Sequence, residues 1–218
     1  SMNATSRQPF IRQWAALTSR YGRNLIRDRK TMAVLIGQVP VMAVLIAFLF
    51  PGDLLALPDE EPGKSAQFVF ILVTASIWLG LITSCREIAS EREIVVRELS
   101  VGIRLDAYLA AKVAILFVLS AVQIGLLTGI ALSLQPTHGS ASTTLQLYLV
   151  LLATAWASVS LGLAISTLAK SVDQATSFVP LVLIPQLFFA GAIIPVAKMS
   201  AVTKAIAALV FARWSFAE

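Results

Sequence analysis

Long apolar segments separated by short polar ones dominate this sequence. Five of them run for roughly 18 to 28 residues, which is the length an α-helix needs to cross a hydrocarbon core about 30 Å thick. Only 13% of the 218 residues are charged and 57% are hydrophobic, whereas a soluble domain carries about 25% charged residues. We therefore expect an all-α polytopic membrane protein, a bundle of five spanning helices. The expected spans cover residues 32–50, 67–85, 107–134, 145–169 and 176–195.

Residues 1–31 are basic and come directly before the first apolar segment. Apolar side chains recur there at helical spacing, from Phe10 through Leu17 to Leu25, while arginines cover the other faces. This pattern predicts an amphipathic helix lying in the membrane interface, with membrane lipid as its partner. The same residues could bind nucleic acid, but a helix that runs straight into a membrane span argues against it.

The distribution of Lys and Arg among the short loops predicts the orientation. The basic N-terminal segment and the arginine-rich stretch 86–106 are expected inside, and the loop that has Lys64 among four acids is expected outside. The protein would then be a multi-pass protein of the plasma (inner) membrane with a cytoplasmic N-terminus. Residues 196–218 fall outside and are expected to form an interfacial or re-entrant helix.

The stretch between the second and third spans concentrates charge in an otherwise apolar chain. It must leave the hydrocarbon, because each charged side chain near the bilayer centre costs about 2.5–3.5 kcal/mol. Helical spacing gathers Val95 and Leu99 on one side, and Glu93 and Arg97 are placed to form an i,i+4 pair. We expect a cytoplasmic helix over 86–102 that presents a charged face to a partner; a merely solvated loop helix is the alternative. Its charged residues are Arg86, Glu87, Glu91, Arg92, Glu93, Arg97 and Glu98.

The ends of this segment have their own signals. Gly102 can end a helix. Asp106 then stands as the N-cap of the third span, with its negative charge at the positive end of that helix.

The run REIASEREIVVRELSVGIRLDAYLAAK, residues 86–112, resembles the segment between the second and third spans of G-type ATP-binding cassette exporter permeases, the type-2 permease group. Three further stretches fit in family order: RYGRNLIRDRKT, LAKSVDQATSFVPLVLIPQLFFAGAIIP and ARWSFAE. The resemblance is strongest to bacterial members that fuse permease and ATPase, some with a forkhead-associated domain. Such permeases have six spans and the last follows the ARW stretch, so the sixth span is expected to be absent from this sequence.

The resemblance implies that residues 32–218 form a permease domain working with a second copy and two nucleotide-binding domains. The seven charged residues of 86–102 would then couple the permease to ATP hydrolysis, which takes place in the partner domain with ATP and magnesium. No cofactor, metal site or catalytic residue is expected in this chain. The GKS at 63–65 is a false P-loop signal, because Pro58 occupies a position that must be glycine.

Polar and aromatic side chains within the spans are candidates for a transport pathway. Gln123 and Gln186 are intramembrane amides, for which hydrogen bonding between helices is the alternative reading. The resemblance places Thr74 and Trp78 toward a central cavity. It also makes Ile193 and Ile194 candidates for an apolar plug, with a lipid-facing anchor as the alternative. A G-x-x-x-G spacing at 125–129 permits close helix approach.

Together these features favour the permease part of an ATP-driven exporter that moves lipid-like or amphipathic cargo outward. The alternative is a non-transport membrane anchor or assembly subunit that recruits a cytoplasmic partner. An ion-coupled carrier is disfavoured because the first three spans contain no carboxylate near their midplanes. A membrane enzyme is disfavoured because His138, the single histidine, has no nearby catalytic partner in the sequence.

Overall fold

The computed structural model describes residues 9–50, 62–100, 102–135 and 141–189. Within these ranges the chain forms seven α-helices and no strand, which confirms the all-α polytopic class. The helices are α1 (Phe10–Arg27), α2 (Arg29–Leu49), α3 (Pro62–Ser84), α4 (Arg92–Ser100), α5 (Leu105–Leu134), α6 (Ala141–Leu168) and α7 (Val172–Phe189).

Four of these helices are long and apolar enough to cross a membrane: α2, α3 from Ala66 onward, α5 and α6. The fifth expected span corresponds to α7, which begins at Val172 and contains Pro180 and Pro185. The remainder of that span and the expected tail helix lie outside the described residues, and so do the plug candidates Ile193 and Ile194.

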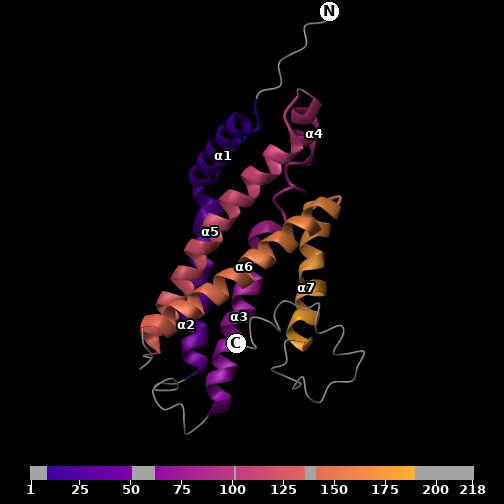
Figure 1. Ribbon diagram of the computed structural model, residues 1–218. Coiled ribbons are helices and arrows are strands. Elements are labelled where there is room, and N and C mark those ends of the chain that lie inside the picture. The colour runs from indigo at the N-terminus through magenta and orange to yellow at the C-terminus, as the bar shows by residue number, and fades with distance from the viewer. Residues whose placement is uncertain (1–8, 51–61, 101, 136–140, 190–218) are drawn as a thin grey trace, which may run out of the picture.

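Helix α5 is the central element of the bundle. α1 and α2 follow one another along it, and α6 crosses it from the other side (Figure 1). The apolar face expected of the N-terminal segment contacts α5: Leu17 is buried in a cluster with Ala107 and Ala111, and Trp14 packs against it. Asp28 separates the first two helices, because its carboxylate accepts the Thr31 amide at 3.2 Å and so caps α2.

The closest helix approach is between α3 and α6. A Cβ added at Gly80 would lie 2.6 Å from the Ala155 carbonyl oxygen, so these backbones are nearly in contact. At Gly125 the nearest atom to an added Cβ is 3.8 Å away, and at Gly129 nothing lies within 4 Å. The tight contact is therefore not at the G-x-x-x-G spacing. It is made by two single glycines, Gly80 against Ala155 and Ser158, and Gly162 against Ser84.

The charged segment is not one helix from 86 to 102. Residues 85–91 form turns, and regular helix resumes only in α4. The reason is visible at Ser166 of α6, whose hydroxyl accepts the backbone amides of Ile88 and Ala89, both at 2.9 Å. Those two amides are thereby taken from the i→i−4 pattern that would continue α3.

The sequence predicted a helix end at Gly102 and a helix N-cap at Asp106, and the structure bears out only the first. Gly102 has φ +99°, and the amides of Gly102 and Ile103 bond the Leu99 and Glu98 carbonyls, which is a Schellman motif. The expected N-cap at Asp106 is wrong: α5 begins at Leu105, and the Asp106 carboxylate lies in its first turn. It accepts the Arg104 side chain at 3.0 Å and the neighbouring Ala107 amide at 2.8 Å, so it acts from within the first turn and not from the N-cap position.

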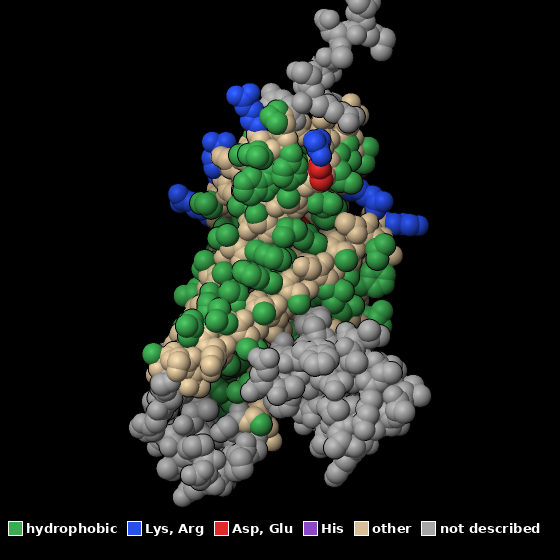
Figure 2. Space-filling model, in the orientation of Figure 1, with side chains coloured by type: hydrophobic (Ala, Val, Ile, Leu, Met, Phe, Trp, Pro, Cys, Tyr) green, Lys and Arg blue, Asp and Glu red, His purple; other side chains and the backbone are tan. Residues whose placement is uncertain are grey.

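Charged side chains on the visible face gather toward the end of the molecule that holds α1 and α4 (Figure 2). The rest of the described surface on this face is apolar or uncharged. Since charge is expelled from hydrocarbon, this end marks one boundary of the membrane.

Candidate coupling site

A buried lysine is the centre of the interactions made by the charged segment. Lys112 lies on α5 with 2% of its side chain exposed, and its ammonium is 2.9 Å from Glu87 and 2.9 Å from Glu91. The ammonium also lies 3.7 Å from the centre of the Tyr21 ring, a cation–π contact. Burial of this charge is tolerated because two of the four carboxylates of the charged segment, together with the ring, face it.

Two tyrosine hydroxyls complete the coordination of these carboxylates. The Tyr21 hydroxyl on α1 donates to Glu87, and the Tyr108 hydroxyl on α5 donates to Glu91 at 3.1 Å. Burial and then the nearby Glu87 charge raise the pKa of Tyr21, so it keeps its proton and remains a donor. We call Tyr21, Glu87, Glu91, Tyr108 and Lys112 the Lys112 cluster; it connects three segments of the chain.

Two further charged residues of the segment are held in place. Glu98 on α4 pairs with Arg20 of α1 at 2.7 Å. Arg92 donates to the Ala169 carbonyl at 2.8 Å, at the C-terminal end of α6, where the helix dipole favours a cation. With the Ser166 contacts, the charged segment is therefore bonded to α1, α5 and α6.

The other three charges, Arg86, Glu93 and Arg97, are exposed. Within the described ranges, their side chains make none of the hydrogen bonds or ion pairs that we find, so the expected Glu93–Arg97 pair is not formed. The apolar side is also only partly buried: Val95 packs on the Leu17 cluster, whereas Val96 is 65% exposed. The seven charges thus divide into four that bind the bundle and three that are exposed, of which Arg86 also lines a neighbouring cavity.

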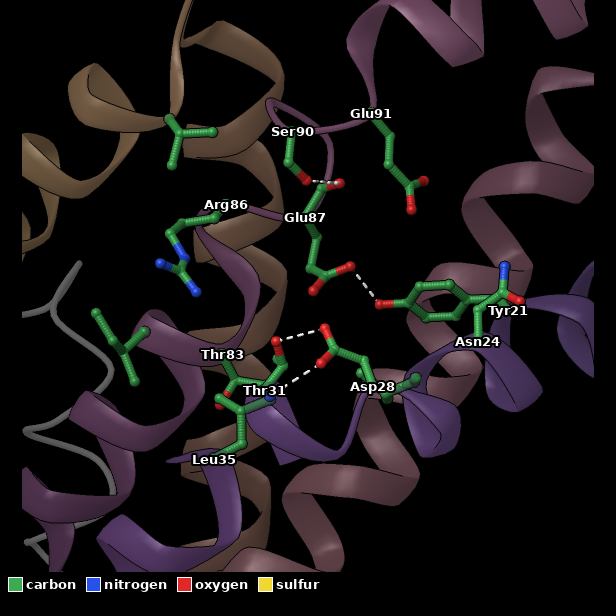
Figure 3. A pocket seen from close by; sticks show the side chains of 13 residues that line it. Tyr21, Asn24, Asp28, Thr31, Leu35, Thr83, Arg86, Glu87, Ser90 and Glu91 are labelled. Atoms are coloured by element: carbon green, nitrogen blue, oxygen red, sulfur yellow. Dashed lines mark hydrogen bonds between the residues drawn. The ribbon is translucent and has the colours of Figure 1, made fainter. Parts of the chain in front are cut away.

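Beside the Lys112 cluster lies a cavity of about 380 Å³, which we call the boundary cavity. Its wall comes from the α1–α2 junction on one side, and from the end of α3 with the 86–91 turn on the other (Figure 3). Figure 3 shows Tyr21, Asp28 and Glu87 pointing toward one another across it. In the described part of the chain, no group of three or more His, Cys, Asp or Glu is placed to hold a metal ion.

The pathway candidates within the spans fall in different places. Gln123 is fully buried; its amide donates to the Leu35 carbonyl at 2.8 Å and accepts from Thr83 at 3.3 Å, so it bonds α5 to α2 and α3. Its geometry is that of interhelical hydrogen bonding. Gln186 on α7 is 7% exposed. The Thr74 hydroxyl is buried without a hydrogen-bond partner among the described residues, and Trp78 packs at the edge of the core.

Sequence reasoning missed the organising role of Lys112 and the contact at Ser166. A lysine within the first turns of a long apolar helix is itself a signal, because a buried cation requires acidic partners. Ser166 gave no such signal, since a serine in an apolar helix bonds its own backbone in most cases.

These features define a class: a polytopic helical membrane protein whose charged segment between two spans is bonded to the surrounding helices. The chain belongs to the ABC-2 type transporter family, whose model matches residues 12–217. It is 32% identical to the ABC transporter ATP-binding/permease protein Rv1747 of Mycobacterium tuberculosis (strain H37Rv) over 223 residues. That match covers 95% of this chain and 25% of the relative, so the chain spans about a quarter of that protein. The resemblance to an ABC permease is confirmed.

Proposed function

We propose that this chain is the transmembrane part of an ATP-driven exporter that moves lipid-like or amphipathic cargo outward. A nucleotide-binding domain, with ATP and magnesium, supplies the energy, and a second copy of the chain completes the pathway. The coupling role is supported by the division of the seven charged residues into two sets. Arg86, Glu93 and Arg97 form the exposed set. The bonded set, which is joined to three helices, consists of Glu87, Glu91, Arg92 and Glu98.

The exposed set suits docking to the ATPase. Glu93 and Arg97 lie on α4 and make no side-chain ion pair with the described residues, so a partner can use both charges without breaking the bundle. Opposite charges at fixed positions favour a specific partner orientation.

The bonded set suits transmission. A displacement of the 85–100 segment reaches α5 through Lys112, α6 through Ser166 and Arg92, and α1 through Arg20. Each contact is a short, directional bond rather than sliding apolar packing. Movement at the docking face is therefore passed to three helices.

The composition of the spans supports an amphipathic cargo. The most apolar 18-residue windows of α2, α3, α5 and α6 contain at most two charged residues each. The buried Lys112 near the start of α5 already has two carboxylate partners. A pathway between such helices offers apolar surface and isolated hydroxyls such as Thr74, which suits a lipid-like molecule better than an ion.

The test is charge reversal at the exposed pair. The double variant Glu93→Arg, Arg97→Glu, in the full-length protein with its nucleotide-binding domain, should stay folded. It should lose lipid-stimulated ATP hydrolysis and transport of a fluorescent lipid by at least about tenfold, since a lost charge contact at an interface costs about 1.4 kcal/mol or more. Arg23→Glu, an exposed reversal on α1, is the matched control and should keep both activities.

The anchor hypothesis predicts a different result. An anchor would bind its cytoplasmic partner equally well with and without ATP and would move no lipid. If the double variant hydrolyses ATP and transports like wild type, Glu93 and Arg97 do not dock the ATPase and the coupling role is wrong.

A further inference from the structure

The boundary cavity lies where three helices meet the membrane surface. Its wall includes residues near the start of α2, the end of α3 and the start of α7. Leu35 and Ile82 line it from within α2 and α3, toward the hydrocarbon, while Asp28 and Arg86 line it just beyond the helix ends. Its volume of about 380 Å³ lies within the about 300–1,000 Å³ typical of ligand sites. A wall that carries apolar side chains at one end and charged side chains at the other suits an amphipathic molecule.

Two opposite charges in this wall are available to a ligand. The Asp28 carboxylate accepts the Thr31 amide and hydroxyl, at 3.2 and 2.6 Å, and these bonds lower its pKa, so it is ionised. Neither Asp28 nor Arg86 has an ion-pair partner within the described ranges. The cavity therefore offers an acceptor for a cation and a donor for an anion.

The charge balance of the wall selects among headgroups. Asp28, Glu87 and Glu91 are acidic and Arg86 is basic; Lys112, bonded to both glutamates, offsets one more negative charge. The site thus keeps a net negative charge. An anionic headgroup is disfavoured, whereas a zwitterion is favoured if its cation is a compact donor that fits between carboxylates.

We propose that the boundary cavity binds an ethanolamine phosphate group, supplied by a phosphatidylethanolamine of the adjacent leaflet. The primary ammonium lies against Asp28 and Glu87, which converge with the Tyr21 hydroxyl in Figure 3. The phosphate lies on the guanidinium of Arg86, which lines the same cavity, and the acyl chains extend into the surrounding lipid. The site goes beyond cargo movement: it belongs to a resident lipid, and its binding does not require transport.

The experiment measures lipid retention by native mass spectrometry. The full-length protein is reconstituted into nanodiscs of equal parts phosphatidylethanolamine, phosphatidylcholine and phosphatidylglycerol, and is then released into detergent. Wild type should retain phosphatidylethanolamine over phosphatidylcholine by about tenfold, because a trimethylated ammonium has no N–H to donate to the carboxylates. Phosphatidylglycerol should be retained least.

Two variants test the two ends of the site. Asp28→Asn keeps a side chain that caps α2, so it preserves the fold while removing the charge; it should abolish the preference for ethanolamine over choline. Arg86→Gln should lower retention of both zwitterionic lipids. Arg23→Gln, an exposed arginine of α1 outside the cavity wall, is the control and should retain lipid like wild type.

Equal retention of all three lipids by wild type overturns the proposal, and so does an unchanged headgroup preference in Asp28→Asn. Free phosphoethanolamine added in detergent distinguishes the source of the group. If it displaces the lipid at equal concentration, the headgroup alone is recognised and a membrane lipid is not the specific occupant. Failure to displace supports the lipid.

Discussion

Replacing Lys112 by methionine would test whether the Lys112 cluster holds the charged segment on the bundle. Methionine fills a similar volume without a charge, so the change removes the ammonium and leaves most of the packing. Glu87 and Glu91 would then face each other across the former lysine site without a cation between them. We expect loss of stability together with local release of the 85–91 turn from α5.

The magnitude follows from burial. Removing one partner of a fully buried ion pair costs about 3–5 kcal/mol, mostly because the remaining charge stays desolvated. The Glu87 and Glu91 side chains keep 19% and 35% of their exposure. Water relieves part of the penalty there, so we expect a loss of about 2–4 kcal/mol. Replacing both glutamates by glutamine as well removes the stranded charges, and the triple variant should recover to within about 1 kcal/mol of wild type.

The assay is reversible unfolding in mixed micelles, followed by far-UV circular dichroism during titration with sodium dodecyl sulfate. Lys170→Met, at an exposed lysine between α6 and α7, is the matched control, and a change within about 0.5 kcal/mol is expected there. A Lys112→Met cost no larger than that of the control would refute the reasoning. A triple variant less stable than Lys112→Met would refute the part that assigns the cost to stranded carboxylates.

Three further changes, with Gly129→Ala as a control, test the packing around the site. Gly80→Ala should cost about 1–3 kcal/mol by the same unfolding assay, because its Cβ meets a backbone carbonyl of α6 at 2.6 Å; Gly129→Ala, with open space around it, should be neutral or stabilising by up to about 1 kcal/mol. Ser166→Ala removes the acceptor for two amides of the 85–91 turn; a loss of about 1–3 kcal/mol and faster amide hydrogen exchange confined to that turn are expected, and unchanged exchange would contradict the assignment. Gln123→Leu should cost about 0.6–2 kcal/mol through its lost interhelical bonds, and transport should survive it, unlike a change at a cargo contact.

Much of the fold could be predicted because the membrane imposes a strong constraint. Spanning length and apolar composition located the segments that form α2, α3, α5 and α6, since each must satisfy its backbone hydrogen bonds within itself. Gly102 was predicted for the same kind of reason, because a positive φ favours glycine. These features depend on local chemistry that a single segment contains.

The site could be predicted only in part, because its geometry depends on contacts between distant segments. The charged residues of 86–98 could be recognised in the sequence, but helical periodicity predicted that they form one continuous face of a single helix. Ser166 is remote in the sequence, yet its hydroxyl breaks the helix that the periodicity implied. In the same way, Tyr21 fits the apolar face of α1 by spacing, and only its position beside Glu87 reveals it as a hydrogen-bond donor.

Two sets of helix contacts meet at the site. α3, the 85–91 turn and α6 form one, fixed by the backbone contact at Gly80 and the bonds to Ser166. α1, α2 and α5 form the other, because α1 and α2 both pack along α5. The Lys112 cluster and Gln123 join the two sets through side chains near the boundary cavity, and farther along the bundle α6 packs directly on α5, where Trp156 stacks on Phe117. Backbone contacts between helices resist sliding, whereas long side chains can change rotamer at little cost. A force on α4 should therefore act first across the Lys112 cluster, before it displaces the helices that pack along α5.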